Sequence, residues 1–237
     1  MTGTRQRAAV LTAIAVMAVS VGPGAHASEE AVDRQTQTAL ALDVHPERGA
    51  PAFGRHCAHC HGAQAQGDAD RAIPALAGQR FTYLIRQLAN FAGAERDSDT
   101  MHGVVQQQGL REPQTWVNIA AYLNRLPPSH RAQIGDGRQL GLGRGIFREQ
   151  CAACHRADAR GDSDGFVPSL RNQQYSYLVL QLHKLGNGYR HNVDEDLVRF
   201  MRSFDDQDID ATADYLSRLR GRGAVHRIMR NDGVVID

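Results

Sequence analysis

Two copies of a five-residue motif, Cys-x-x-Cys-His, constrain this chain more than any other feature of its sequence. The first copy spans 57–61 and the second spans 151–155, and together they use all four cysteines of the 237 residues. Two thiols three positions apart lie within one turn of a helix, and a histidine directly follows the second thiol. This pattern is typical of covalent haem attachment.

The chemistry of haem explains the residue types and their spacing. Cys57 and Cys60 would form thioethers with the two vinyl groups of one haem, and His61 would ligate its iron. The second motif supplies the same set for a second haem: Cys151, Cys154 and His155. A zinc site would need cysteine pairs about 15–20 residues apart, which is far closer than these. A redox-active dithiol and a structural disulfide are further, weaker alternatives.

An internal repeat extends well beyond the two motifs. A shift of 94 positions superposes Gly49 on Gly143 and Phe53 on Phe147 before the motifs. After them it matches several further pairs: Pro74 with Pro168, Leu76 with Leu170, Gln79 with Gln173, Tyr83 with Tyr177, Gln87 with Gln181 and Arg96 with Arg190. Self-similarity at a fixed period indicates repeated structural units. We therefore expect module 1 at 45–127, a linker at 128–138 and module 2 at 139–221.

Both modules show apolar residues at helical spacing. The expected helices are, in repeat pairs, 49–57 and 143–151, 81–91 and 175–185, and 113–126 and 206–219. Few windows alternate with period two, so almost no sheet is expected and the fold class is all-α. Residues 28–44 form a polar lead-in, and residues 222–237 form a tail without clear periodicity.

These matched positions resemble two tandem class I cytochrome c domains, each wrapped around one covalent haem. The string Pro-x-Leu, Gln, Tyr-Leu and Gln-Leu, present twice, makes the chain similar to the cytochrome c4 family of dihaem electron carriers, over about residues 45–220. The resemblance implies that the first and last helices of each module cross closely at Gly49 and Gly143. It also implies that the carbonyls of Pro74 and Pro168 accept the free N–H of each haem histidine.

The resemblance further implies a methionine as the sixth ligand of each iron. In module 1 this is Met101, forty residues after His61. Module 2 departs from the pattern, because a shift of 94 from Met101 gives Glu195, which has no thioether.

Counting back from the last helix of module 2 gives Asp194 or Leu197, and neither carries sulfur. Met201, 46 residues after His155, is the favoured ligand of the second iron. His191, His183 and an open position are the alternatives.

The N-terminus resembles a secretory leader. Arg5 and Arg7 precede an apolar run at 8–21, and an Ala-x-Ala site ends at Ala27. This pattern predicts a cleavable signal peptide at 1–27 and export to the periplasm. An uncleaved membrane anchor is the alternative, although the run is shorter than the roughly 20 residues that span a bilayer.

Charge and motif content narrow the function. The chain has 27 basic and 26 acidic residues, two of the basic ones in the leader, so no basic surface for nucleic acid is expected. No catalytic set stands out, and we expect an electron carrier that is not itself an enzyme and is at most peripheral to the membrane. The resemblance implies redox protein partners, with a quinol-oxidising complex or dehydrogenase as donor and a terminal oxidase or reductase as acceptor. A haem subunit of a periplasmic dehydrogenase, or a ligand-binding or catalytic second haem, are the alternatives.

Overall fold

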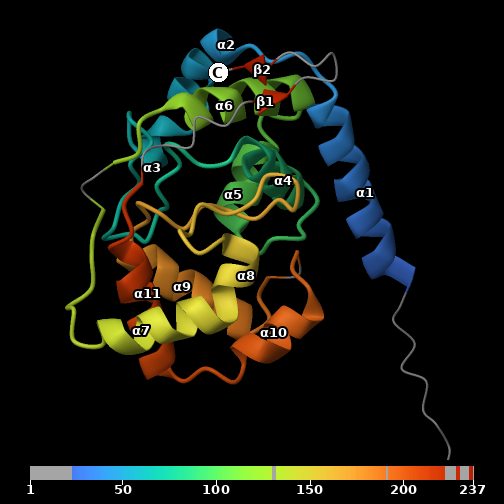
Figure 1. Ribbon diagram of the computed structural model, residues 1–237. Helices are drawn as coiled ribbons and strands as arrows, with labels where there is room; N and C mark the ends of the chain where they lie inside the picture. The colour runs from blue at the N-terminus through green and yellow to red at the C-terminus, as the bar shows by residue number, and fades with distance from the viewer. Residues whose placement is uncertain (1–22, 130–131, 191, 222–227, 230–234, 237) are drawn as a thin grey trace, which may run out of the picture.

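The structure is a computed structural model that describes residues 23–129, 132–190, 192–221, 228–229 and 235–236. Most of the expected leader, 1–22, lies outside these residues, as does His191. Module 1 forms the upper half of Figure 1 and module 2 the lower half, with loops of both modules between them.

The helices of module 1 include the three that its sequence predicts. They are α2 (Pro46–His56), α3 (Ala58–His61), α4 (Phe81–Ala92), α5 (Asp99–Val105) and α6 (Pro113–Arg125). Pro46 and Pro113 begin α2 and α6, where the missing N–H of proline costs no helical hydrogen bond. The short helix α5 is an addition to the prediction.

Module 2 repeats this order with one local difference. Its helices are α7 (Leu140–Ile146), the π-helix η1 (Phe147–Cys151), α8 (Ala152–His155), α9 (Tyr175–Gly186), α10 (Glu195–Met201) and α11 (Asp206–Ser217). A capping box between Asp205 and Asp208 fixes the start of α11. Where module 1 has one α-helix leading to its motif, module 2 has α7 followed by the wider turn of η1.

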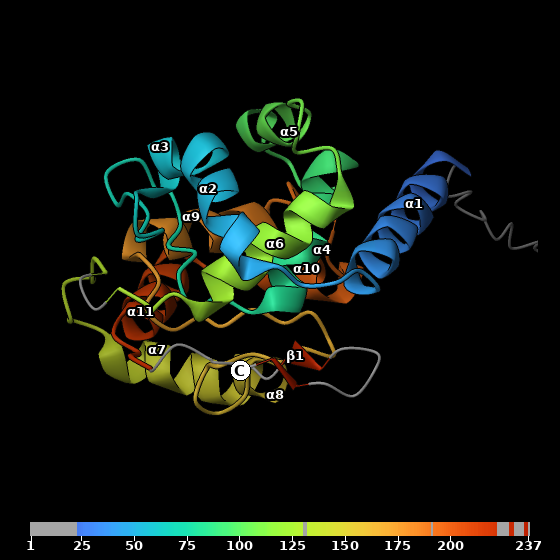
Figure 2. The same cartoon turned by 90° about the horizontal axis from the view of Figure 1, so that it is seen from above.

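The first and last helices of each module cross at the two predicted glycines. A Cβ at Gly49 would lie 2.0 Å from the carbonyl oxygen of Asn118 on α6, and a Cβ at Gly143 would lie 1.9 Å from that of Ala211 on α11. Only glycine permits so close an approach. Figure 2 shows α2 crossing over α6, as the resemblance implied.

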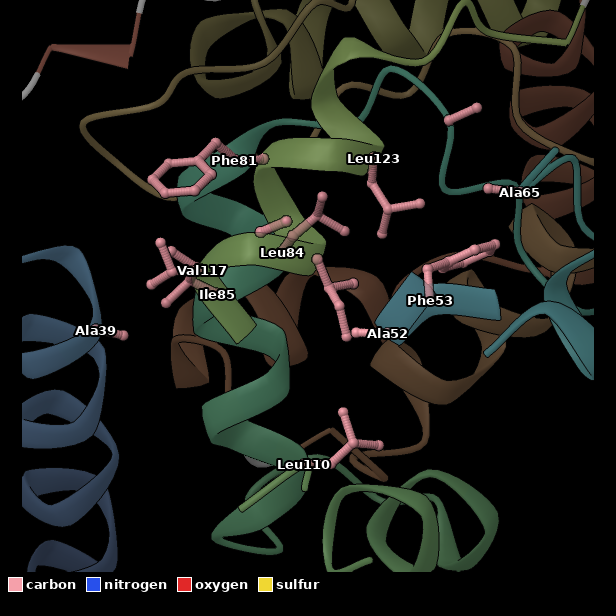
Figure 3. Packing of buried hydrophobic residues seen from close by; sticks show 14 residues of the cluster. Ala39, Ala52, Phe53, Ala65, Phe81, Leu84, Ile85, Leu110, Val117 and Leu123 are labelled. Carbon is pink, nitrogen blue, oxygen red and sulfur yellow. The ribbon is translucent and has the colours of Figure 1, made fainter. Parts of the chain in front are cut away.

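Aromatic pairs pack beside both crossings. The ring centroids of Phe53 and Tyr122 are 5.7 Å apart, and those of Phe147 and Tyr215 are also 5.7 Å apart. Figure 3 shows Phe53 and Ala52 of α2 in the same core as Ile85 of α4 and Val117 of α6. The expected core role of these aromatic residues follows from this packing.

The polar segment before module 1 forms a helix, α1 (Pro23–Leu40). It lies along α4 and α6 on the outside of module 1 in both views. Val32 is buried with Ala89 and Trp116, and Asp33 forms an ion pair with Arg86 of α4. The helix passes through Ala27, the expected cleavage position.

Sheet is nearly absent from the described residues, as expected. The only strands there are β1 (Ile228–Met229) and β2 (Val235–Ile236), paired antiparallel in the tail. Within the same described part of the chain, no helix is both long and apolar enough to cross a bilayer.

Candidate haem sites

In module 1 the turn from α2 into α3 brings the first motif together. The amide of Cys57 donates to the carbonyl of Phe53 at 2.8 Å, and the amide of His61 donates to the carbonyl of Cys57 at 3.0 Å. Nδ1 of His61 lies 3.0 Å from the carbonyl oxygen of Pro74. A carbonyl only accepts, so Nδ1 carries the proton and Nε2 is left unprotonated, as an iron ligand must be.

Module 2 repeats this arrangement. Nδ1 of His155 lies 3.1 Å from the carbonyl oxygen of Pro168, which fixes the same tautomer. Cys151 is partly buried and Cys154 is exposed. Each module thus presents two thiols and one oriented imidazole within a single turn of helix, which is the donor set that a covalent haem needs.

The electrostatic environment keeps these groups neutral. Burial lowers the pKa of His61 and of His155 below the usual range, although the hydrogen bonds to Pro74 and Pro168 oppose the shift. Burial, with a smaller contribution from Cys60, raises the pKa of the Cys57 thiol to about 12. A neutral imidazole in an apolar setting suits ligation of iron.

A reciprocal contact between the modules joins the two sites. Ala75, next to Pro74, donates its N–H to the side-chain oxygen of Gln173 at 2.9 Å, and the side-chain amide of Gln173 donates back to the carbonyl of Ala75 at 3.0 Å. Module 1 makes the equivalent contact with module 2. Ser169, next to Pro168, donates its N–H to the side-chain oxygen of Gln79 at 2.8 Å, and the side-chain amide of Gln79 donates to the carbonyl of Ser169 at 2.9 Å. The segments that orient both haem histidines are therefore held by the other module.

Further matched contacts extend this interface. The hydroxyl of Thr82 donates to the carbonyl of Ser163 at 2.7 Å, and the hydroxyl of Ser176 donates to the carbonyl of Ala69 at 2.7 Å. These four residues form two pairs related by the shift of 94. Gln79 and Gln173 recur at the same position of the repeat, and this recurrence is the sequence signal for their role at the interface, which was not predicted.

Arg96, which is buried, and Arg190, which is partly buried, also meet between the modules. Arg96 and Arg190 pair through an isolated antiparallel bridge, and the guanidinium of Arg96 donates to Gln87 at 2.7 Å and to the hydroxyl of Tyr177 at 2.7 Å. Among the described residues, neither arginine forms an ion pair with a carboxylate of the chain. Burial of such positive charge is costly without an anion. The recurrence of this pair at the shift of 94 is the sequence signal for the contact, although no function was predicted for it.

The two candidate methionines occupy different settings. Met101 lies in the first turn of α5 and is half-buried, whereas Met201 is the last residue of α10 and is 4 % exposed. His183 lies in the last turn of α9. The structure places Met101 and Met201 at unlike positions of corresponding helices.

Comparison with known proteins identifies the fold. The family model for Cytochrome c matches residues 46–127 and again residues 141–220. The chain is 31 % identical, over 78 % of its length and 88 % of the relative, to the thiosulfate dehydrogenase electron acceptor of Stutzerimonas stutzeri.

Two solved structures share the architecture. Reduced cytochrome c4 from Pseudomonas stutzeri superposes with a TM-score of 0.67 at 24 % identity, covering 75 % of this chain and all of that one. Thiosulfate dehydrogenase from Marichromatium purpuratum superposes with a TM-score of 0.64 at 26 % identity, covering 73 % of this chain and 40 % of that one. The repeated motifs, the repeated fold and these matches agree: the chain belongs to the cytochrome c family and is a cytochrome c4-like electron-transfer protein with two covalent haems c.

Proposed function

We propose that this protein accepts electrons from a periplasmic dehydrogenase that oxidises thiosulfate and passes them on to a terminal oxidase or reductase. The observation that carries this proposal is the 31 % identity, over most of both chains, to a thiosulfate dehydrogenase electron acceptor. The likeness to part of a thiosulfate dehydrogenase structure supports the same class of partner. Export to the periplasm by the leader at 1–27 is part of this proposal.

The chain's own residues would divide the work of holding two haems. Cys57 and Cys60 would fix the first haem, with His61 and Met101 on its iron. In module 2 the corresponding attachment residues would be Cys151, Cys154 and His155. A bound haem would supply a one-electron couple, and the fixed tautomers of His61 and His155 would keep each Nε2 free to ligate its iron.

Arg96, which is buried, and Arg190, which is partly buried, would compensate the negative charge of the carboxylates that haem carries. Arg96 and Arg190 lie between the modules without a carboxylate partner among the described side chains. Although burial alone raises the pKa of Tyr83, the charges of Arg96 and Arg190 lower it below its usual value, which reflects a net positive environment. Haem propionates at this position would neutralise it.

Reduction of the oxidised holoprotein by thiosulfate tests the proposed partner. We expect thiosulfate alone to leave the visible spectrum unchanged, and catalytic amounts of a thiosulfate dehydrogenase to reduce the haems fully. Ferricyanide serves as the control acceptor that shows the dehydrogenase to be active. If the enzyme reduces ferricyanide but not this protein, the proposal is wrong.

A quinol-oxidising complex is the second candidate donor, since the cytochrome c4-like fold does not by itself select a dehydrogenase. Mixing the same oxidised protein with such a complex and its quinol separates the two candidates. We expect reduction by the dehydrogenase to be at least ten times faster. The reverse order of rates would favour the quinol-oxidising donor.

A further inference from the structure

The two short helices α5 and α10 occupy corresponding places in the two modules. Both have seven residues, and both begin one residue after a side chain that caps the first turn. The hydroxyl of Ser98 accepts from the amide of Met101 at 3.3 Å, and the carboxylate of Asp194 accepts from the amide of Asp196 at 2.7 Å. Capping fixes where a helix begins and therefore which way each of its residues faces.

This common start sets the register between the two helices. Arg96 and Arg190 correspond at a shift of 94, but α5 begins three residues after Arg96 and α10 begins five residues after Arg190. Module 2 thus has two additional residues before α10, so corresponding positions in α5 and α10 differ by 96 and not by 94. A shift of 96 places Leu197 at the position of Met101.

Burial along the helices supports the same register. The last residue is buried in each, with Val105 1 % exposed and Met201 4 % exposed, and the residue two before it is exposed in each. Met201 therefore occupies the core position of Val105. It also sits where α10 approaches α9, since a Cβ at Gly186 would lie 3.1 Å from the carbonyl oxygen of Met201. Unbranched methionine commonly fills such positions in cores.

Leu197 differs from Met201 in its exposure to solvent. It is 40 % exposed, one of the few large apolar side chains so exposed in the described part of the chain. Its hydrocarbon side chain has no atom that can bind iron. The position that provides a thioether in module 1 thus provides none in module 2.

His183 is placed unfavourably for the same role. At a shift of 94 it corresponds to Ala89 of α4, which is buried beneath α1 together with Val32 and Trp116. His183 accordingly lies on the outward side of α9, the side that corresponds to the one covered by α1 in module 1.

We infer that the second haem iron has no methionine ligand, because Leu197 replaces Met101 and Met201 is a core residue, and that its open side binds a neutral diatomic ligand such as carbon monoxide. This inference rests on the proposed haem attachment in module 2. It makes the two haems chemically unequal: the first is closed by the protein, and the second is accessible to a small molecule.

Two spectroscopic readings of the purified dihaem protein test it. The near-infrared band of ferric iron–methionine bonds should have the intensity of one such bond per chain. The ferrous protein should bind one carbon monoxide per chain. A band of double intensity would overturn the inference, and so would the absence of carbon monoxide binding. The binding measurement also detects a histidine ligand such as His191, which would block carbon monoxide without adding to the band.

Three matched variants assign the ligands. Leu197→Met should double the band and abolish carbon monoxide binding, whereas Met101→Leu should abolish the band and raise binding to two per chain. Met201→Leu, a volume-conserving change in a core position, should alter neither reading. If Met201→Leu halves the band, Met201 is a ligand and the inference fails.

Haem content separates this inference from the proposed attachment. Every variant should retain two covalent haems per chain by mass, with an unchanged far-ultraviolet circular dichroism spectrum. A wild-type protein with only one covalent haem would contradict the attachment in module 2. Two haems with two iron–methionine bonds would contradict the ligand inference alone.

Discussion

Module 1 and module 2 share their haem-attachment segments but differ in how much core surrounds them. The core cluster of module 1 joins residues from α1, α2, α4 and α6, whereas that of module 2 contains Phe147, Ala159, Leu178, Ala213 and Leu216. His61 is 7 % exposed, while His155 is only partly buried. Both modules keep the motif and the contact between its histidine and a proline carbonyl, whereas the apolar packing around them differs.

The helix α1 accounts for part of this difference. It adds Ala39 to the core of module 1 and covers α4 and α6 with Val32 and its neighbours. On module 2, the described residues include no equivalent helix over α9. A module with less side-chain core depends more on its haem for apolar contacts, so the two modules should respond differently to haem loss.

Removal of the attachment cysteines should have the largest effect on the fold, and it tests directly whether module 2 depends more on its haem than module 1 does. Cys57→Ala with Cys60→Ala, and Cys151→Ala with Cys154→Ala, should each lower the covalent haem from two to one per chain. The second pair should also abolish hydrogen-exchange protection of α9, because module 2 has the smaller core, while the first pair leaves part of the protection of α4.

The matched control for the cysteine variants is His59→Ala. His59 is an exposed residue inside the first motif, so its loss should leave two haems and full protection. Equal loss of protection in the two modules after haem removal would contradict the proposed dependence on core size.

Substitution of the crossing glycines by alanine should have the next largest effect, and the loss of unfolding free energy should be similar in the two modules. Gly49→Ala and Gly143→Ala each force a Cβ to within about 2 Å of a backbone oxygen, and the overpacking should cost about 3 kcal/mol of unfolding free energy. Gly54→Ala and Gly145→Ala are the controls, since nothing lies within 4 Å of a Cβ there, and should be neutral or stabilising in chemical denaturation. A much smaller cost at Gly143 would show that the second crossing is looser than the first.

Loss of the interface glutamines should have the smallest of these effects and should differ between the modules. Gln173→Leu leaves two buried backbone groups of Ala75 without partners, which should cost about 2 kcal/mol. Gln79→Leu exposes the partly buried groups of Ser169, which water can reach, and should cost about 1 kcal/mol. Denaturation measures both costs, and the exposed Gln108→Leu is the control. A larger loss for Gln79→Leu would contradict this order.

The sequence predicted the features that depend on repeated residue types. Both cofactors, the tandem all-α architecture and six helices followed from the motifs, the 94-residue repeat and apolar periodicity. The glycines at the crossings were predictable because only a residue without a side chain can fill such a position.

The features that were missed have weak or ambiguous patterns. The buried face of α1 consists of Val32, Thr36 and Ala39, too small and too polar to give a clear apolar period. The helices α5 and α10 are each two turns long, too short for periodicity to be recognised. The proposed register, in which Leu197 is the counterpart of Met101, depends on where α10 begins, and residue type and distance along the chain do not reveal that position.

The exchange of glutamine side chains between the modules is self-complementary. Each module carries both the glutamine that reaches across and the backbone pair that receives it. A polypeptide with a single such unit would therefore possess every group needed to build the same contact with an identical copy, as a two-fold symmetric homodimer. Joining two units in one chain fixes that pairing regardless of protein concentration, and it leaves the residues of the two halves free to diverge from one another.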